Sequence, residues 1–377
     1  NEIELRRGQP RLHRGLAHLP LAEADRVATG AEISFFQDWL RESDPDSRYW
    51  RQRGHARRLA AVRAPVFMVA GWYDIFLPWQ LDDHAALVAA GARPRLTIGP
   101  WTHGSVDMYR ATLGSALTWM LAHSNGGPVA GQLDGPPVRI HVGGVDEWRD
   151  LDRWPPAGPP AQPWYLRPGG ALRPGGALRP GGALGPSGVD RAGAGESDLA
   201  GRFRYDPAEP TPAVGGPRLV GQIAGRRDNR ELERREDVLT FTSDPLPTGL
   251  ELIGPVTATV YLRSSRPFFD VFVRVCDVDL AGRSWNLSDA LTRVDPRRYP
   301  VDPDGVVAVP VALWPLAHRF LPGHRIRVQV SGGAHPRYAR NPGTGAALGA
   351  AGALVAVEHE VRCGAGTRSV VHLPVVR

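Results

Sequence analysis

The sequence has only two cysteines among its 377 residues, Cys276 and Cys363, and they lie far apart in the chain. This excludes a disulfide framework and a Cys-x-x-Cys metal site, and it predicts two buried thiols. No stretch of eighteen apolar residues occurs, so we expect no membrane-spanning helix and no membrane partner. The histidines show neither His-x-x-x-His nor His-Glu-x-x-His spacing, so we expect no catalytic metal and no other cofactor.

Lysine is absent as well, and all 45 basic residues are arginines, which give the chain a formal net charge of +6. The arginines are scattered and form no basic stripe with interleaved aromatic residues, so we expect no nucleic-acid partner. No secretory signal is recognisable, which favours a cytoplasmic protein. The chain begins at Asn1 rather than at a methionine, so we expect that it has been processed or truncated and that any targeting segment has been lost with the missing part.

Glycine and proline are abundant, with 44 and 36 residues, which favours a turn-rich and largely β architecture over a helical bundle. The length suits two domains. Residues 17–60 have the pattern of short amphipathic helices. They are followed by an apolar run at 63–70, helical spacing at 79–90 and a second apolar run at 95–98, which together predict one βαβ unit. Another helix is expected at 111–124.

Beyond residue 126 the sequence changes to short alternating segments separated by proline, glycine and aspartate. This spacing predicts a second domain that is a β-sandwich or jelly roll. The expected strands are Val138–Val142, Trp164–Leu166, Val238–Thr242, Val256–Arg263, Phe269–Asp277, Val306–Val311 and Arg325–Val330. The hexapeptide Arg-Pro-Gly-Gly-Ala-Leu occurs three times in tandem at 167–184, which predicts a lengthened surface hairpin loop, with a β-solenoid or a partner-binding linker as the alternative.

Two residues of the βαβ unit carry hydrolase chemistry. Asp74 follows the first strand and His103 follows the second, so both are expected at the edge of the sheet where ligands and catalytic groups gather. The order Asp before His fits the chain order Ser, Asp, His of the α/β-hydrolases. His103 would act as the base, and Asp74 would hold its tautomer and stabilise the imidazolium. Taken alone, the spacing is weak evidence for a catalytic pair, because either residue could be a surface residue or a satisfied polar group.

The flanking motifs are more specific. The segments Gly71-Trp-Tyr-Asp-Ile-Phe76 and Ile98-Gly-Pro-Trp-Thr-His-Gly104 closely resemble the cocaine-esterase-like branch of the Xaa-Pro dipeptidyl-peptidase (S15-type) hydrolase family. The resemblance covers nearly everything after residue 17. It continues through Val142–Arg149, Trp154-Pro155, Arg204–Pro207, Asp237–Ser243, Phe320–Arg325 and Val328–Ser331.

The resemblance implies three parts: a helical cap remnant at 1–60, the C-terminal part of an α/β-hydrolase domain at 61–125, and a galactose-binding-like jelly-roll β-sandwich at 126–377. It implies that Asp74 and His103 are the triad acid and base, and that Phe76 stands against the acyl group of the substrate. We expect Trp72 and Trp101, from the same two motifs, to contact substrate as well.

One departure from the family pattern stands out, because no Gly-x-Ser-x-Gly elbow occurs anywhere in the sequence. Ser105 is no substitute, since it lies on the loop of His103 and lacks a strand-turn-helix setting. We therefore expect the serine and the oxyanion hole on a preceding segment, and no activity from these 377 residues alone. The alternative is a non-catalytic jelly-roll binding module or a degenerate hydrolase relative.

The expected partner is a small ester or amide. The choice among an ester, a β-lactam side-chain amide and an Xaa-Pro peptide stays open, because half a pocket does not define selectivity. A homodimer also stays open.

Overall fold

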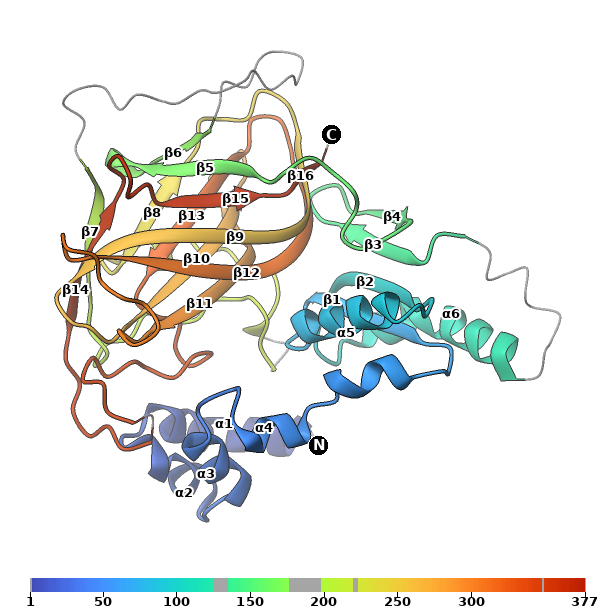
Figure 1. Cartoon of the computed structure of the whole chain (residues 1–377), viewed down its shortest axis with the longest axis horizontal. Coiled ribbons are helices and arrows are strands. Elements are labelled where there is room, and N and C mark those ends of the chain that lie inside the picture. Colours follow the sequence, from blue (N-terminus) through green and yellow to red (C-terminus); the bar gives the residue numbers. More distant parts are fainter. Residues whose placement is uncertain (1, 125–134, 176–197, 220–222, 348, 377) are drawn as a thin grey trace.

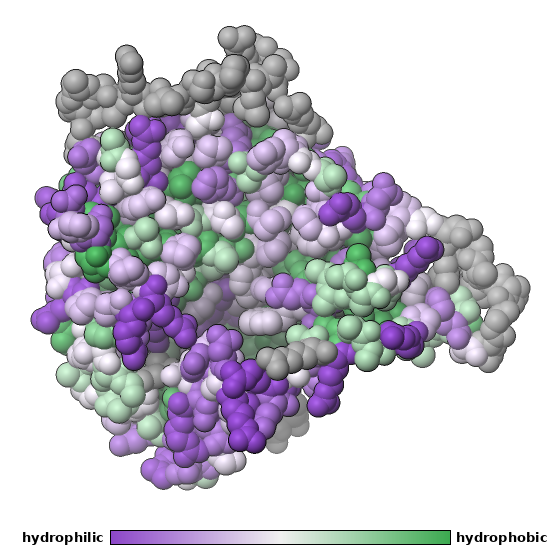
Figure 2. All heavy atoms as spheres, in the orientation of Figure 1, coloured by the Kyte–Doolittle hydropathy of each residue, from purple (hydrophilic) through white to green (hydrophobic). Residues whose placement is uncertain are grey.

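The computed structural model describes residues 2–124, 135–175, 198–219, 223–347 and 349–376. Figure 1 shows three parts in these residues: a lobe of helices at the N-terminal end, a small sheet flanked by two helices, and a large curled sheet. In Figure 2 the helical lobe is largely hydrophilic, whereas hydrophobic atoms gather around the helices of the small sheet. Within the described residues, no helix is long and apolar enough to cross a bilayer.

The helical lobe confirms the short helices expected at 17–60 and adds a longer one before them. Asp25 is buried and organises the lobe, because its carboxylate accepts hydrogen bonds from the main chain of Ile33 at 2.7 Å and from the amide of Gln37 at 3.0 Å. The lobe rests on a loop of the large sheet, where Ala22 N donates to Gly349 O at 3.1 Å. Its elements are α1 (Glu2–Ala17), η1 (Leu21–Glu23), α2 (Ala24–Thr29), α3 (Ser34–Arg41), α4 (Arg48–Arg53) and η2 (Ala56–Ala61).

The small sheet confirms the βαβ unit. Strand β1 (Phe67–Tyr73) pairs in parallel with β2 (Arg95–Thr102), and α5 (Leu77–Ala89) connects them. Helix α6 (Val106–Ser124) follows β2. The sheet then continues past residue 126, because β3 (Val138–Val142) pairs in parallel with β2 and β4 (Glu147–Leu151) pairs antiparallel with β3. The strand expected at Val138–Val142 therefore forms, but in the small sheet.

The large sheet contains twelve strands in the described residues and confirms the strands expected from Trp164 onward. Side chains alternate in burial along its long strand β12, as expected where one face packs on a core. The sheet curls over one apolar core (Figure 1). Its strands are β5 (Gln162–Arg167), β6 (Ala171–Pro174), β7 (Leu199–Tyr205), β8 (Val238–Thr242), β9 (Leu250–Ser264), β10 (Phe269–Val278), β11 (Ser284–Val294), β12 (Val306–Phe320), β13 (Arg325–Ser331), β14 (Val357–Arg362), β15 (Val370–Leu373) and β16 (Val375–Val376).

The first copy of the hexapeptide repeat forms a tight hairpin turn between the antiparallel strands β5 and β6. The turn η4 (Pro168–Gly170) contains Gly169 and Gly170 at positive φ, a conformation that glycine adopts at no steric cost. The second copy begins in β6 and is described as far as Gly175, whereas its last three residues and the third copy lie outside the described residues. Both cysteines are buried, as predicted, and neither forms a disulfide.

The two sheets share an apolar core. Ile253 of β9 and Ala317 of β12 are buried together with the side chains of β1, β2 and β3. Beside them Gly143 N donates to Ala317 O at 3.0 Å, and Arg319 N donates to Gly143 O at 2.8 Å. A Cβ on Gly144 would lie 2.0 Å from Arg319 O, so only glycine permits this approach. The ends of β1 and β2 are therefore held close to the large sheet.

Candidate active site

Asp74 lies directly after β1, in a turn that holds its carboxylate. Asp74 N donates to Gly71 O at 3.0 Å, and Asp74 Oδ1 accepts a hydrogen bond from Phe76 N at 2.9 Å. This side-chain-to-backbone bond is the usual way in which aspartate fixes a turn. Asp74 is only 5% exposed. The carboxylate is thus buried and oriented before α5 begins at Leu77.

His103 lies directly after β2, and its imidazole faces Asp74. His103 Nδ1 is 3.3 Å from both carboxylate oxygens of Asp74. The side chain of His103 is 37% exposed, whereas that of Asp74 is 8% exposed. The contacts of the ring with Asp74 are made through Nδ1, so Nε2 is the ring nitrogen that Asp74 does not contact. A histidine held at Nδ1 in this way can accept a proton at Nε2 from a neighbouring nucleophile. Hydrogen bonds between catalytic groups are often this long before substrate binds.

Phe76 lies beside the histidine. Its ring meets the imidazole of His103 edge-on, with centroids 5.1 Å apart and an interplanar angle of 77°. Half of Phe76 is exposed. The ring therefore offers an apolar surface next to the imidazole.

Trp72 and Trp101 lie elsewhere, because both indoles are buried. Trp72 is 7% exposed and donates its Nε1 hydrogen to His141 O at 2.7 Å. Trp101 is 6% exposed and packs against Trp148 at 5.7 Å between centroids. Alternation along a strand turns these side chains into the protein beside residues that face the site. The expected substrate contacts of both tryptophans therefore find no support in the structure.

Nothing in the sequence indicated that the large sheet reaches this site. Tyr73, the residue before Asp74, donates its hydroxyl hydrogen to Asn286 O of β11, and Thr102, the residue before His103, lies beside Gly225 in a loop that precedes β8. Among the residues that the structure describes, no group of three or more His, Cys, Asp or Glu side chains could hold a metal ion.

The small sheet carries an aspartate and a histidine after adjacent parallel strands, and a large β domain follows it. This is an arrangement that two-domain hydrolases use. Two family models match the chain. The model described as X-Pro dipeptidyl-peptidase (S15 family) matches residues 5–105, and the model described as X-Pro dipeptidyl-peptidase C-terminal non-catalytic domain matches residues 131–372.

Two named esterases are similar in sequence to this chain, in agreement with the family models. The chain is 30% identical over 348 residues to a cocaine esterase of Rhodococcus sp. (strain MB1 Bresler), covering 87% of this chain and 58% of that protein. It is 27% identical over 331 residues to a putative serine esterase of Mycobacterium bovis, covering 78% of this chain and 48% of that protein. The chain therefore spans about half the length of these two relatives.

Solved structures show the same fold. An α-amino acid ester hydrolase superimposes with a TM-score of 0.79 at 23% identity, over 96% of this chain and 64% of that one. An aminopeptidase from a marine sediment Thaumarchaeota archaeon superimposes with a TM-score of 0.77 at 22% identity, over 94% of this chain and 62% of that one. The chain belongs to the Xaa-Pro dipeptidyl-peptidase (S15-type), cocaine esterase-like hydrolase family.

Proposed function

We propose that this chain supplies the acid and base of a serine hydrolase that cleaves esters or amides through an acyl-enzyme. His103 takes the proton of the serine hydroxyl and returns it to the leaving group, while Asp74 fixes the tautomer of His103 and stabilises the imidazolium. The serine and the oxyanion-hole donors lie outside these 377 residues. The observation that carries the proposal is the contact of His103 Nδ1 with both carboxylate oxygens of Asp74 at 3.3 Å.

Three further observations support it. The Asp74 carboxylate is buried and fixed by Phe76 N, so it is ordered before substrate arrives. The imidazole is partly exposed, whereas the carboxylate is not. The sequence contains no Gly-x-Ser-x-Gly elbow, which is the motif that presents the nucleophile in this fold. The chain has the acid and the base and needs the serine from elsewhere.

The parts of the chain take the following roles in this proposal. The helical lobe at residues 1–60 is the remnant of a cap over the site. The segment at 61–125, whose sheet is extended by β3 and β4, is the C-terminal part of the hydrolase domain. The rest of the domain expected at 126–377 is a galactose-binding-like jelly roll. The position of β1 supports the proposal that the hydrolase sheet is incomplete in this chain, because in the described residues β1 pairs with β2 alone. Further parallel strands would pair with its free edge.

The test requires a protein that carries the serine together with these residues. It should hydrolyse a simple activated ester and react with a fluorophosphonate probe. His103→Ala should lower kcat by about 10⁴-fold or more, and Asp74→Asn should lower it by about 10⁴-fold because the wrong tautomer is then held. His55→Ala is the matched control, because His55 is exposed and lies in the helical lobe. Undiminished turnover by His103→Ala would refute the proposal, and a gene without an elbow would favour a non-catalytic binding module.

A further inference from the structure

Tyr73 connects the aspartate loop to the large sheet. It is the last residue of β1 and immediately precedes Asp74. Trp72 is buried in the core of the small sheet, and the partly buried Tyr73 packs against the same core while its hydroxyl reaches the large sheet. The hydroxyl of Tyr73 donates to the main-chain oxygen of Asn286 in β11 at 3.2 Å. Burial raises the pKa of Tyr73 to about 12, so the hydroxyl remains a donor at neutral pH.

Asn286, whose main-chain oxygen accepts this hydrogen bond, is held in place by its own contacts. It is 1% exposed and lies where the register of β11 against β10 shifts, and such bulges re-aim main-chain and side-chain groups. Its side chain fixes the loop 225–229, because Oδ1 accepts from Arg227 N at 2.7 Å and Nδ2 donates to Gly225 O at 3.1 Å. The acceptor for Tyr73 and the loop 225–229 therefore form one rigid unit.

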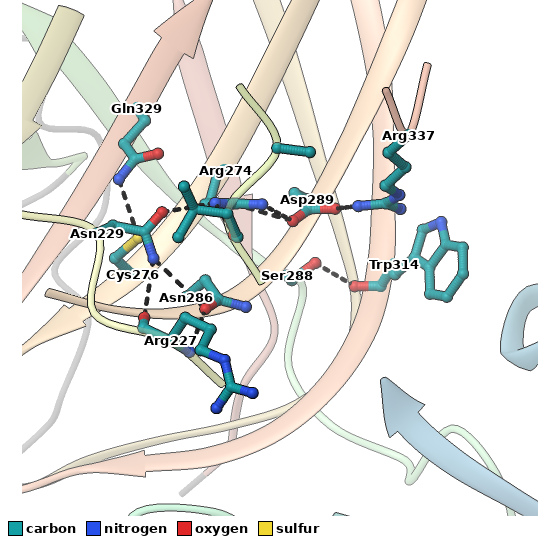
Figure 3. Close-up of polar contacts among 12 residues, drawn as sticks. Arg227, Asn229, Arg274, Cys276, Asn286, Ser288, Asp289, Trp314, Gln329 and Arg337 are labelled. Carbon is teal, nitrogen blue, oxygen red and sulfur yellow. Dashed lines mark hydrogen bonds and ion pairs between the residues drawn. The ribbon is translucent and has the colours of Figure 1, made fainter. Parts of the chain in front are cut away.

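A buried ion-pair network supports this unit (Figure 3). Arg274 is 1% exposed and donates to Asn229 Oδ1 at 2.6 Å and, through Nε and Nη2, to Asp289 Oδ2 at 2.9 and 2.8 Å. Arg337 pairs with the other oxygen of Asp289. Buried charges that are paired and hydrogen-bonded hold their neighbours in one arrangement.

The same loop also abuts the histidine loop. Gly225 has a φ of +80°, and a Cβ built on it would lie 3.3 Å from Thr102 Cγ2. Thr102 is the last residue of β2 and immediately precedes His103. Asn286 of β11 therefore binds the residue before the aspartate, and the loop that Asn286 holds lies beside the residue before the histidine.

We propose that Tyr73 is a positioning residue, which fixes the Asp74 carboxylate by anchoring the end of β1 to the large sheet. Gly225, in the loop that Asn286 holds, lies beside Thr102 at the end of β2. The bond of Tyr73 to Asn286 thereby sets the position of Asp74 relative to His103. The inference rests on the proposed function of that pair. In this inference, the domain at residues 131–372, which matches the model of a non-catalytic domain, helps to organise the active site through Asn286.

The experiment uses this 377-residue chain and needs no turnover. Long-range ¹H–¹⁵N correlation spectra of the His103 ring report which nitrogen carries the proton. The parent chain should show the Nδ1–H tautomer, because Asp74 accepts at Nδ1. Tyr73→Phe removes only the hydroxyl, and it should convert His103 to a mixture with the Nε2–H tautomer. Tyr205→Phe is the matched control, because it removes a hydroxyl from a tyrosine buried in the large sheet and should leave the tautomer unchanged.

Asp74→Asn separates this inference from the function on which it rests. If Asp74→Asn alters the tautomer of His103 and Tyr73→Phe does not, the positioning role of Tyr73 is overturned and the acid-base pair stands. If Asp74→Asn leaves the tautomer unchanged, the pair itself fails and the positioning role fails with it. In a protein that carries the serine, Tyr73→Phe should lower kcat by roughly 10-fold to 100-fold, with KM within about twofold of the parent value.

Discussion

The ring of Phe76 stands edge-on to the imidazole of His103, at 5.1 Å between centroids. Phe76 also fixes the neighbouring carboxylate, because its main-chain N–H donates to Asp74 Oδ1. Phe76 therefore contacts both residues of the pair, Asp74 through its backbone and His103 through its side chain. A substitution of its side chain tests the second role while leaving the first in place.

Phe76→Ala should raise KM for esters with bulky acyl groups by roughly 10-fold to 200-fold and should change KM for acetyl esters much less. The reason is that a small difference in apolar contact between substrate and pocket changes the free energy of discrimination between substrates by ~1–3 kcal/mol. The measurement is a comparison of steady-state kinetics across an acyl series in a protein that carries the serine. Trp79→Ala is the control, because Trp79 is also exposed and lies in α5. Equal effects of the two substitutions would contradict a specific acyl contact of Phe76.

His359 should make the large sheet sensitive to acid. It is 1% exposed between the rings of Phe203 and Phe269, and within the described residues neither ring nitrogen has a hydrogen-bond partner. Burial lowers the pKa of His359 to about 3. The unfolded chain binds a proton there below about pH 6.5, whereas the folded chain does not. The free energy of unfolding therefore keeps its full value above about pH 6.5. It falls as the pH is lowered towards about 3, by up to about 1.4 kcal/mol per pH unit.

His359→Leu should flatten this dependence. Urea unfolding at several pH values between neutrality and the acid limit measures it directly. His55→Leu, which replaces an exposed histidine, should leave the parent slope unchanged. A parent slope that persists in His359→Leu would refute the assignment.

Arg274→Met should destabilise the large sheet by about 3–5 kcal/mol, because it leaves buried polar partners unpaired. Arg274 and Asp289 are each 1% exposed. Arg297→Met is the matched control, since Arg297 pairs with Asp295 and is 84% exposed. Its unfolding midpoint should hardly change, because exposed ion pairs contribute little. Denaturant unfolding of both variants checks the prediction, and equal midpoints would contradict it.

Helix α6 should cause this chain to associate. Its apolar side chains recur at three- and four-residue spacing, so they form a stripe along the helix. Each is between 51% and 66% exposed, and continuous apolar patches of this kind promote association. They are Val106, Tyr109, Leu113, Leu117, Met120 and Leu121. Sedimentation velocity should show concentration-dependent association that Leu117→Glu reduces and Ser115→Glu does not. A chain that is monomeric at all concentrations would contradict this prediction.

Local sequence signals predicted much of the fold. The apolar runs at 63–70 and 95–98 and the helical spacing between them correspond to β1, β2 and α5, because hydrophobic periodicity is a local property. Strand β11 was missed for the opposite reason. Its residues Ser284, Asn286 and Asp289 are polar and resemble a loop, yet all are buried, since their partners come from distant segments of the chain.

The sequence by itself determined which residues carry the candidate chemistry. Two parallel strands next to each other end at one edge of a sheet, so Asp74 and His103 had to lie near one another once the βαβ unit was recognised. Only the tertiary structure decided which of the aromatic residues in the two motifs are buried and which segment of the large domain lies against the two loops. Tyr73 meets an acceptor 213 residues further along the chain, and such a contact depends on how two sheets pack rather than on any local pattern.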